Sequence, residues 1–497
     1  MLFFIFFNPF WRAILNFLSW QFLTFIVLFL AVYWVIPKKY RYLIILGGSL
    51  FFYGYHDRMV LLILGASVLI TYTGGRALEK WPLRRVFAIF FASNIFILVF
   101  FKYTNFIISN IDKLMSFRVS EMDILLPVGL SFYIFQSTSY LSDVYRRHMP
   151  AERNFLRYAA FVSFFPTILS GPIQKSRNLL PQIKAPADFC SDQAVKGLIL
   201  FLWGAFEKIC VANRLLVIIN TVFLPDTYRN YGTAHYIVAA VSFSIYIYAD
   251  FSSYSDMARG IAKFMGIDVG RNFLTPYLST SLSEFWRRWH VSLNDWFVEN
   301  IYIPLGGSRR GKWRKYFNIM VVFFISGFWH GAAWHFVVWG VANGFLMVLG
   351  EIMKPFKSSL YKKVHIDEHS KSMIFFQRLV VFWLITITWV FFRNGVKASL
   401  HIIERMTWFS PAKLFRPDLF TICGSVTQTF LTMLFVAAFY YVQCRRYDFE
   451  ESATFLSFAK QPLIFQWTVL GALLSVVIFM HAAAGTSVNT TFLYFNF

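Results

Sequence analysis

The sequence predicts an all-α protein that crosses a membrane many times. Hydrophobic residues make up 57% of its 497 positions and charged residues only 14%, whereas soluble domains carry about 25% charged residues. Aromatic residues are unusually frequent, with 61 Phe and 16 Trp. We therefore expect one integral-membrane domain over residues 1–497, built from roughly 11 transmembrane helices with additional re-entrant or interfacial helices.

Long apolar runs recur along the whole chain, although several are shorter than the roughly 20 residues that a straight span needs. The first long run should remain as a spanning helix, because the apolar residues before it lack the basic start and cleavage site of a secretory signal. The runs cover residues 14–36, 42–55, 59–74, 86–101, 124–141, 158–173, 197–222, 236–250, 317–329, 331–350, 374–392, 427–442 and 464–482.

The chain carries a formal charge of +22. In membrane proteins such an excess of Lys and Arg collects in cytoplasmic loops and at lipid headgroups, which explains most of it. Basic cytoplasmic loops could also attract an anionic donor such as a coenzyme A thioester. Nucleic-acid binding is not expected, since no soluble basic domain is present. The four cysteines show no CxxC spacing, so neither a disulfide framework nor a zinc site is indicated.

Basic segments predict the course of residues 316–350. The segments 309–315 and 351–372 are rich in Lys or Arg, and both should be cytoplasmic loops. The residues between them must then enter the membrane and return as two short helices bent near Gly327–Gly331, with His330 at the bend. The loop 393–426 is too basic for the outer face on which the alternation of spans would place it, so part of it could form an interfacial helix.

Residues 281–344 are the strongest candidate for a functional region. They hold three of the ten histidines, His290, His330 and His335, together with a basic loop and two dense Trp clusters. Titratable side chains in membrane-embedded sequence are costly and usually functional. His330 lies in the sequence SGFWHGA, where small neighbours allow a close approach. An imidazole is a natural general base for a hydroxyl group, but a structural histidine bonded to a carbonyl fits the sequence equally well.

His290 follows the sequence WRRW and is expected on a helix that begins near residues 281–283. On one continuous helix Trp286, His290 and Asn294 would share a face, because residues four apart are neighbours. The two arginines of the WRRW sequence would point elsewhere, toward lipid headgroups or a phosphate. An interfacial belt of Trp and Arg without catalytic function is the alternative.

Three other motifs are rejected. The run GGSRRGK resembles a P-loop, but Trp313 replaces the Ser or Thr that binds Mg²⁺. The sequence HIDEH at 365–369 has the spacing of an inverted zincin but lies in a Lys-rich polar loop. No G-x-S-x-G elbow of a serine hydrolase occurs.

Several polar residues lie within apolar sequence and are expected to be structural, because buried charges normally pair. Glu207 and Lys208 are adjacent and could pair with each other. The other residues of this kind are Gln136, Asp143, Asp250 and Asp256.

A close resemblance to the membrane-bound O-acyltransferase (MBOAT) family is carried by three stretches, NFLTPYLSTSLSEFWRRWHVSLNDWF, IYIPLGGSRRG and SGFWHGAAWHFVVWG. Further similar stretches are spread over residues 20–345, among them LPVGLSFYIFQSTSYLSDVYR and YADFSSYSDMARGIAKFMGI. The IPLGG run favours the AlgI-like branch, the membrane subunits of bacterial polysaccharide O-acetylation systems, over the D-alanyl-transferring branch. The chain departs from the family pattern after Trp296, where it has Val298-Glu299-Asn300 in place of a common Arg-Asp-Tyr.

The resemblance implies an MBOAT-like helical bundle around a central funnel, with roles for individual residues. His330 in the WHG motif corresponds to the family's catalytic histidine, and His290 in the WRRWH motif corresponds to the second characteristic one. No metal and no bound cofactor are implied. Candidate substrate-binding residues beside the two histidines are Trp286, Arg287, Arg288, Trp289, Asn294 and Trp329.

The C-terminal tail, residues 483–497, is expected on the outer face of the membrane. Its residues Phe492, Tyr494 and Phe497 match a terminal F-x-Y-x-x-F pattern found in proteins of this kind. The Tyr494 hydroxyl is therefore a candidate acyl carrier, because a tyrosine can act as a nucleophile. An aromatic anchor at the membrane interface is the alternative.

We expect an O-acyltransferase that moves an acetyl group from cytoplasmic acetyl-CoA, or a related thioester, to an extracytoplasmic polysaccharide. The resemblance implies a bacterial cytoplasmic (inner) membrane and an extracytoplasmic partner acetyltransferase of the SGNH type, similar to AlgX or AlgJ. Alginate, cellulose and peptidoglycan all remain open as acceptors. The alternatives are a transporter or channel that uses the histidines as a proton relay, and a lipid or protein acyltransferase of the same family.

Overall fold

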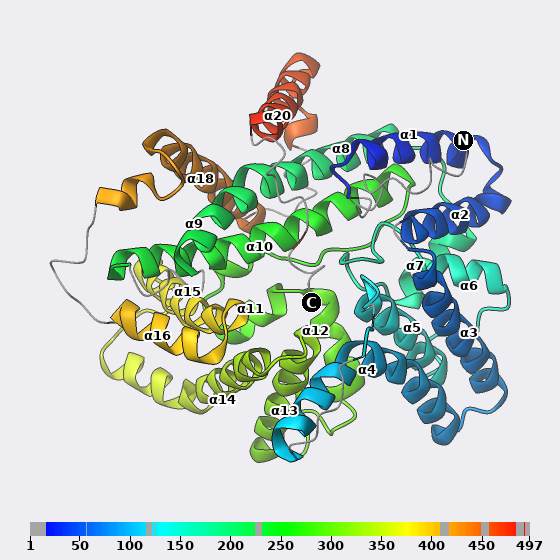
Figure 1. The fold of residues 1–497 in the computed structure, drawn as a ribbon, viewed down its shortest axis with the longest axis horizontal. Helices are drawn as coiled ribbons and strands as arrows, with labels where there is room; N and C mark the ends of the chain where they lie inside the picture. Colours follow the sequence, from blue (N-terminus) through cyan, green and yellow to red (C-terminus); the bar gives the residue numbers. More distant parts are fainter. Residues whose placement is uncertain are drawn as a thin grey trace. The chain divides into compact units, whose positions relative to one another are not determined.

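The regular elements in this computed structural model are all helical (Figure 1). The structure describes residues 16–55, 57–115, 122–124, 126–223, 231–407, 417–448, 457–483 and 492, and no β-strand occurs among them. The predicted all-α architecture is confirmed. The α-helices are α1 (Trp20–Val35), α2 (Arg41–Gly54), α3 (Met59–Lys80), α4 (Arg84–Met115), α5 (Leu130–Tyr145), α6 (Phe155–Val162), α7 (Ser176–Lys184), α8 (Ser191–Phe206), α9 (Asn213–Phe223), α10 (Thr233–Phe264), α11 (Leu282–Arg288), α12 (Val291–Phe297), α13 (Lys312–His330), α14 (Trp334–Lys363), α15 (Lys371–Arg393), α16 (Val396–Thr407), α18 (Val426–Asp448) and α20 (Leu463–Ala483).

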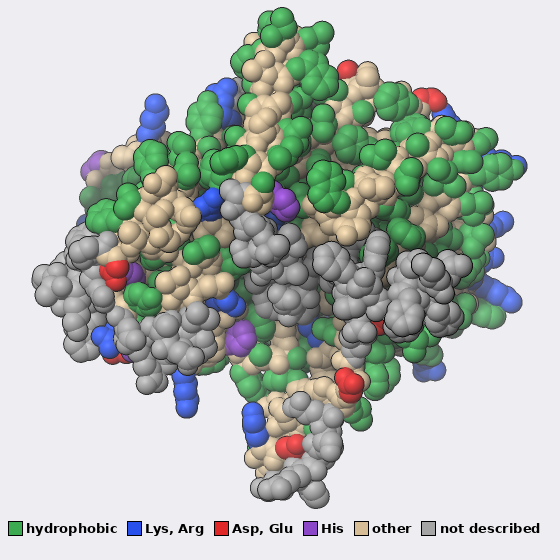
Figure 2. Space-filling view, turned by 45° about the horizontal axis from the view of Figure 1, so that its top comes forward, with side chains coloured by type: hydrophobic (Ala, Val, Ile, Leu, Met, Phe, Trp, Pro, Cys, Tyr) green, Lys and Arg blue, Asp and Glu red, His purple; other side chains and the backbone are tan. Residues whose placement is uncertain are grey.

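Seven helices in the described part of the chain are long and apolar enough to cross a membrane, namely α3, α4, α10, α14, α15, α18 and α20. In the most apolar windows of α4 and α20 only 17% of the residues are buried inside the protein. Helices that are apolar and exposed in this way require lipid around them. Figure 2 shows apolar side chains over much of the face drawn. The protein is therefore a multi-pass membrane protein, while roughly 11 spans stays a prediction.

The chain divides into two compact units. The first contains Met1–Gly204, Tyr254–Arg271 and Thr490–Asn496, and the second contains Ala205–Ser253, Asn272–Asn489 and Phe497. Helix α10 contributes residues to both units. The functional region predicted from the sequence belongs entirely to the second unit.

In the first unit α3 packs against α4 and α5, and α2 packs against α6. Acidic side chains of this unit that lie in apolar sequence are paired with other polar groups, as predicted. Asp143 accepts a hydrogen bond from the Ser176 hydroxyl at 2.8 Å and forms an ion pair with Arg177 at 3.0 Å. Asp256 pairs with Arg259 at 2.9 Å. These residues stabilise the fold.

Of the predicted tail motif, only Phe492 is described. Its ring is buried against Tyr254 of the first unit, with ring centroids 5.1 Å apart. Tyr494 and Phe497 lie outside the described residues.

In the second unit α13 and α14 lie side by side and are joined at residues 331–333 (Figure 1). The predicted turn and the position of His330 at it are confirmed. The predicted lengths are wrong, because α14 has 30 residues and continues through the Lys-rich segment to Lys363. Lysines at the end of a helix interact favourably with its dipole, so the basic residues extend the helix here.

Two further predictions concern the second unit. The basic loop 393–426 does contain a helix, α16, while its place at the membrane interface stays a prediction. The pairing of Glu207 with Lys208 is wrong. Lys208 forms a buried ion pair with Asp250 at 2.6 Å, and Glu207 accepts a hydrogen bond from Ser252 at 2.6 Å. The two residues are the first two of a π-helical segment, Glu207–Ala212, and their side chains bond to different residues of α10.

Candidate functional site

A cavity of about 340 Å³ lies in the second unit and is lined by residues of α11, α12, α13, α14 and the π-helical segment Val298–Tyr302. It brings together predicted candidates up to 44 positions apart in the sequence, because α11 packs against α14 and the segment Val298–Tyr302 packs against α13. The predicted site residues that line it are Trp286, Arg287, Trp289, His290, Asn294 and His330.

The helix expected through His290 is broken at that residue. The Ser281 side chain caps α11 by accepting a hydrogen bond from the Glu284 amide, as predicted. However, α11 ends at Arg288, and His290 adopts a left-handed conformation (φ 45°, ψ 55°) at the start of α12. Trp286 and Asn294 therefore reach the cavity from two separate helices, and not from one face of one helix.

Hydrogen bonds from the backbone of residues 272–274 hold this break in place. The Asn272 carbonyl accepts a hydrogen bond from the Val291 amide at 2.9 Å, and the Leu274 amide donates to the Arg288 carbonyl at 2.9 Å. A non-glycine residue in the left-handed region costs on the order of 1 to 3 kcal/mol, and such conformations persist where surrounding contacts enforce them. The backbone of residues 272–274 supplies those contacts for His290.

The His290 side chain is buried in the second unit. Its Nδ1 lies 3.0 Å from Oδ1 of Asn272, and its ring packs edge-on against Phe251 with centroids 4.7 Å apart. Residues 282–297 lie outside the seven candidate spans. Burial disfavours the charged imidazolium and lowers the pKa of His290 to about 3. The ring is therefore neutral at physiological pH.

His330 is the last residue of α13 and is only 4% exposed. Its ring is surrounded by aromatic rings, with centroids 4.7 Å from Trp329 and 5.0 Å from both Trp339 and Phe392. Trp329 does not line the cavity, but its ring also lies 6.2 Å from that of His290. It thus packs against both histidines.

A close crossing of α13 and α14 positions His330. Gly327 and Gly340 face each other across the two helices, and a Cβ on Gly327 would lie 3.0 Å from the Gly340 Cα and overlap the Phe336 carbonyl oxygen. Small residues at such a crossing let helix backbones approach closely. The glycine before the WHG motif is therefore a packing requirement of the helix pair.

The two arginines of the WRRW sequence differ in position. Arg287 is exposed and lines the same cavity as Trp286 and His290, so the prediction that it points away from their face is wrong. Arg288 forms an ion pair with Glu284 at 2.9 Å and donates to the Leu274 carbonyl at 3.0 Å. It does not line the cavity and instead braces the helix break.

Charged residues from α13 and α14 also line the cavity. Lys315 forms an ion pair with Glu351 at 2.5 Å, and Glu351 also pairs with Lys354. The sequence marked Lys315 only as part of a basic loop, and it gave no role to Glu351 or to Asn272. Asn272 is 18 residues from His290, a separation with no local periodicity that could have indicated the contact.

His335, the third histidine of the region, does not line the cavity. Its Nδ1 lies 3.0 Å from the Phe391 carbonyl oxygen, so it donates a hydrogen bond to the backbone of α15. His335 therefore makes a structural contact of the kind that was considered as the alternative for His330.

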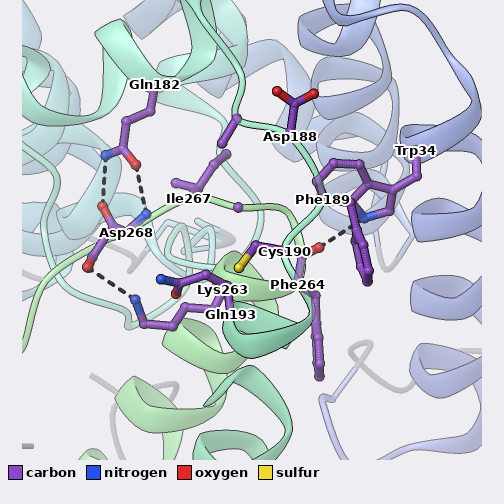
Figure 3. Close-up of a pocket in the computed structure, with 12 residues that line it drawn as sticks. Trp34, Gln182, Asp188, Phe189, Cys190, Gln193, Lys263, Phe264, Ile267 and Asp268 are labelled. Atoms are coloured by element: carbon purple, nitrogen blue, oxygen red, sulfur yellow. Dashed lines mark hydrogen bonds and ion pairs between the residues drawn. The ribbon is translucent and has the colours of Figure 1, made fainter. Parts of the chain in front are cut away.

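A second cavity, of about 180 Å³, lies in the first unit (Figure 3). Its polar side chains are engaged with one another: Gln182 bonds both backbone groups of Asp268, and Lys263 pairs with the Asp268 carboxylate at 3.2 Å. The Trp34 indole donates to the Phe264 carbonyl at 3.0 Å. None of the predicted site residues lines it. The candidate chemistry therefore belongs to the cavity of the second unit.

Comparison with known proteins agrees with this site. The family model described as "MBOAT, membrane-bound O-acyltransferase family" matches residues 86–394, which include the whole cavity. The chain is 32% identical over 391 residues to a probable alginate O-acetylase AlgI of Pseudomonas putida, covering 77% of each chain. A probable alginate O-acetylase AlgI of Pseudomonas syringae is 33% identical over 77% of this chain and 72% of the relative. A peptidoglycan O-acetyltransferase of Helicobacter pylori is 30% identical over 74% of each chain.

Proposed function

This chain belongs to the membrane-bound O-acyltransferase family and is an O-acyltransferase, and from that premise we propose that it moves an acetyl group from cytoplasmic acetyl-CoA to an extracytoplasmic polysaccharide. The observation that carries the proposal is the cavity that holds both His290 and His330. The sequence similarity to O-acetylating relatives favours this function over the transporter alternative, which needs no thioester chemistry.

His330 would act as the general base. As the acceptor hydroxyl oxygen attacks the thioester carbonyl carbon, its proton passes to the imidazole. The C–S bond then breaks, and the thiolate leaves and takes a proton from the imidazolium. The products are an ester and a free thiol, so atoms and charges balance. His290 would assist from the same cavity, and the surrounding Trp and Phe rings would exclude water that could hydrolyse the thioester.

The charges of the cavity support an anionic donor. Arg287 and Lys315 are two cations on its lining, and coenzyme A carries phosphate groups. Arginine and lysine are the usual protein partners of phosphate. We assign Arg287 and Lys315 to donor binding, with Trp286, Trp289 and Asn294 around the acyl arm.

The acceptor is proposed from the relatives' names, which specify alginate and peptidoglycan. Both are extracytoplasmic polymers with free hydroxyl groups, and a bacterial inner-membrane location of this protein is part of the proposal. A separate extracytoplasmic acetyltransferase would complete the modification. Tyr494 could carry the acetyl group to it as a tyrosyl ester. Direct transfer from the thioester to the polymer is the alternative route.

The function can be tested in proteoliposomes with acetyl-CoA, labelled in the acetyl group, on the side of the basic loops. The opposite side receives alginate or peptidoglycan fragments, with and without the candidate partner transferase. The proposal predicts release of free CoA and label on one polymer. Label that crosses the membrane while the thioester stays intact would support the transporter alternative. Label found only in lipid or protein would support the other acyltransferase alternative.

A further inference from the structure

Asn272 makes unusually many contacts to the turn that carries His290. It is 1% exposed and lies 18 residues before the histidine. Its side-chain oxygen Oδ1 lies 3.3 Å from the Ser292 amide nitrogen, 2.9 Å from the Ser292 hydroxyl and 3.0 Å from His290 Nδ1. Its backbone carbonyl accepts the Val291 amide as well. One residue thus fixes both the backbone and the side chains of this turn.

These contacts determine which imidazole nitrogen of His290 carries the proton. A backbone N–H can only donate, so the amide atom of Asn272 that faces Ser292 must be the carbonyl oxygen. This oxygen can only accept, and therefore the nearby Nδ1 of His290 must donate to it. A neutral imidazole has a single N–H, which leaves the lone pair on Nε2.

We propose that Asn272 is a positioning residue that locks His290 as its Nδ1–H tautomer, so that Nε2 accepts a hydrogen bond during acyl transfer. The inference rests on the proposed function for its catalytic meaning, while the tautomer itself follows from the contacts alone. A His290 of this form receives a proton or a hydrogen bond through Nε2 and does not donate one there. In the cavity, its Nε2 would accept a hydrogen bond from the hydroxyl group of the acyl acceptor, or from the imidazolium N–H of His330.

The surroundings of His290 keep this tautomer neutral. The rings of Phe251, Phe273 and Trp329 pack against it. The titratable groups that share its cavity are Arg287, Tyr302, Lys315, Glu351 and His330. Among the described residues, the hydrogen-bond partner of His290 Nδ1 is the amide oxygen of Asn272 and not a carboxylate. The pKa of His290, lowered by burial, agrees with a neutral ring.

The tautomer can be measured without any substrate. We suggest protein labelled with ¹⁵N and ¹³C in histidine, with the His290 signals assigned by subtraction of the spectrum of His290→Gln. The expected result is an Nδ1–H imidazole at pH 6 to 8, which becomes a mixture of tautomers in Asn272→Ala. An Nε2–H imidazole in the wild type would overturn the proposal, whatever the enzyme is found to acetylate.

The effect on catalysis is measured as thioester turnover of Asn272→Ala and Asn272→Asp. Asn272→Ala should lose turnover on the order of 100-fold, because His290 would then adopt the wrong orientation or the wrong tautomer for acyl transfer. Asn272→Asp still accepts from Nδ1 and should retain much of the activity. Its carboxylate should raise the pKa of His290 by about 1 to 3 units. As the pH is lowered, His290 should then become protonated, and turnover should be lost, at a higher pH than in the wild type.

A matched control separates positioning from stability. Asn343 is equally buried in the same unit, where it donates to the Trp339 carbonyl at 2.8 Å and accepts a hydrogen bond from the Thr388 hydroxyl at 3.3 Å. Asn343→Ala should leave both the tautomer of His290 and the pH profile of turnover unchanged. Identical pH profiles for Asn272→Asp and wild type would contradict the proposal, and so would full turnover in Asn272→Ala. Absence of turnover in the wild type, with the predicted tautomer present, would instead contradict the proposed function.

Discussion

Arg287 and Arg288 are adjacent in the chain but have different surroundings. Arg287 lines the cavity, whereas the guanidinium of Arg288 is held by Glu284 and a backbone carbonyl. A sequence pattern of two arginines gives no reason to separate them. Both residues lie on α11, before the helix break. Arg287 shares a helix face with Ser283 and Trp286, which also line the cavity, whereas Arg288 lies one position beyond that face.

Arg287→Met should raise the KM for acetyl-CoA about tenfold, which corresponds to about 1.4 kcal/mol of binding free energy. The reason is the loss of a cation from the site of an anionic donor, so kcat should change much less. Steady-state kinetics at fixed ionic strength measures both constants. Lys312→Met is the control, because it removes a basic residue, the first of α13, that does not line the cavity. Equal KM values for the two variants would contradict the assignment of Arg287.

Glu351→Gln should have the opposite effect on KM. The Glu351 carboxylate pairs with Lys315 inside the cavity and so competes with donor phosphates for this cation. Its neutralisation should lower the KM for acetyl-CoA a few-fold, roughly the worth of one partly exposed charge pair. Increasing salt should reduce the difference between variant and wild type. A KM that rises in Glu351→Gln would show that the carboxylate binds substrate itself.

At the scale of the element, the crossing of α13 and α14 is the critical packing feature. Gly327→Ala should destabilise the protein by about 1 to 3 kcal/mol, because the added Cβ meets the backbone of α14. It should also lower turnover, since His330 is three residues away. Thermal unfolding in detergent and the turnover assay measure the two effects.

Gly350→Ala is the matched control for this crossing. Gly350 lies on α14 with open space around its Cβ position, so alanine should be neutral or slightly stabilising. If Gly327→Ala behaved like Gly350→Ala in both assays, the close approach of the two helices would not be needed to position His330.

The sequence predicted the elements better than their details. The spacing of basic segments correctly predicted the turn next to His330, because charge and span length are local properties. The break at His290 was not predicted, because a non-glycine residue in the left-handed region leaves no sequence signal. The Asn272 contact was missed for another reason: it is a tertiary contact that only the fold creates. Arg287 was misplaced because tertiary packing decides which face of α11 meets the cavity, and Arg287 lies on that face with Trp286.

At the scale of the whole molecule, the chain places its candidate chemistry in one compact unit of a membrane protein. The first unit holds Phe492 of the tail motif, and the second unit holds both histidines. The proposed route through the tail makes a Tyr494 ester an intermediate that can be detected directly.

Tyr494→Phe should abolish label on the protein after incubation with labelled acetyl-CoA, because phenylalanine has no hydroxyl to acylate. Mass spectrometry of the C-terminal peptide identifies the acetyl group directly. Tyr441→Phe, on the exposed face of α18, is the control and should leave the label unchanged. Label that persists on the protein in Tyr494→Phe would contradict the assignment of Tyr494 as the carrier, and undiminished acetylation of the polymer by this variant would favour direct transfer.

The most direct test of the account is thioester turnover by purified wild type, His330→Ala and His335→Ala in the presence of acceptor. The two histidines lie five residues apart, but only His330 lines the cavity. The account predicts that His330→Ala loses turnover by about 100-fold or more, the usual contribution of a general base, while His335→Ala retains it. Equal turnover in wild type and His330→Ala would contradict the central claim that acyl transfer takes place in this cavity.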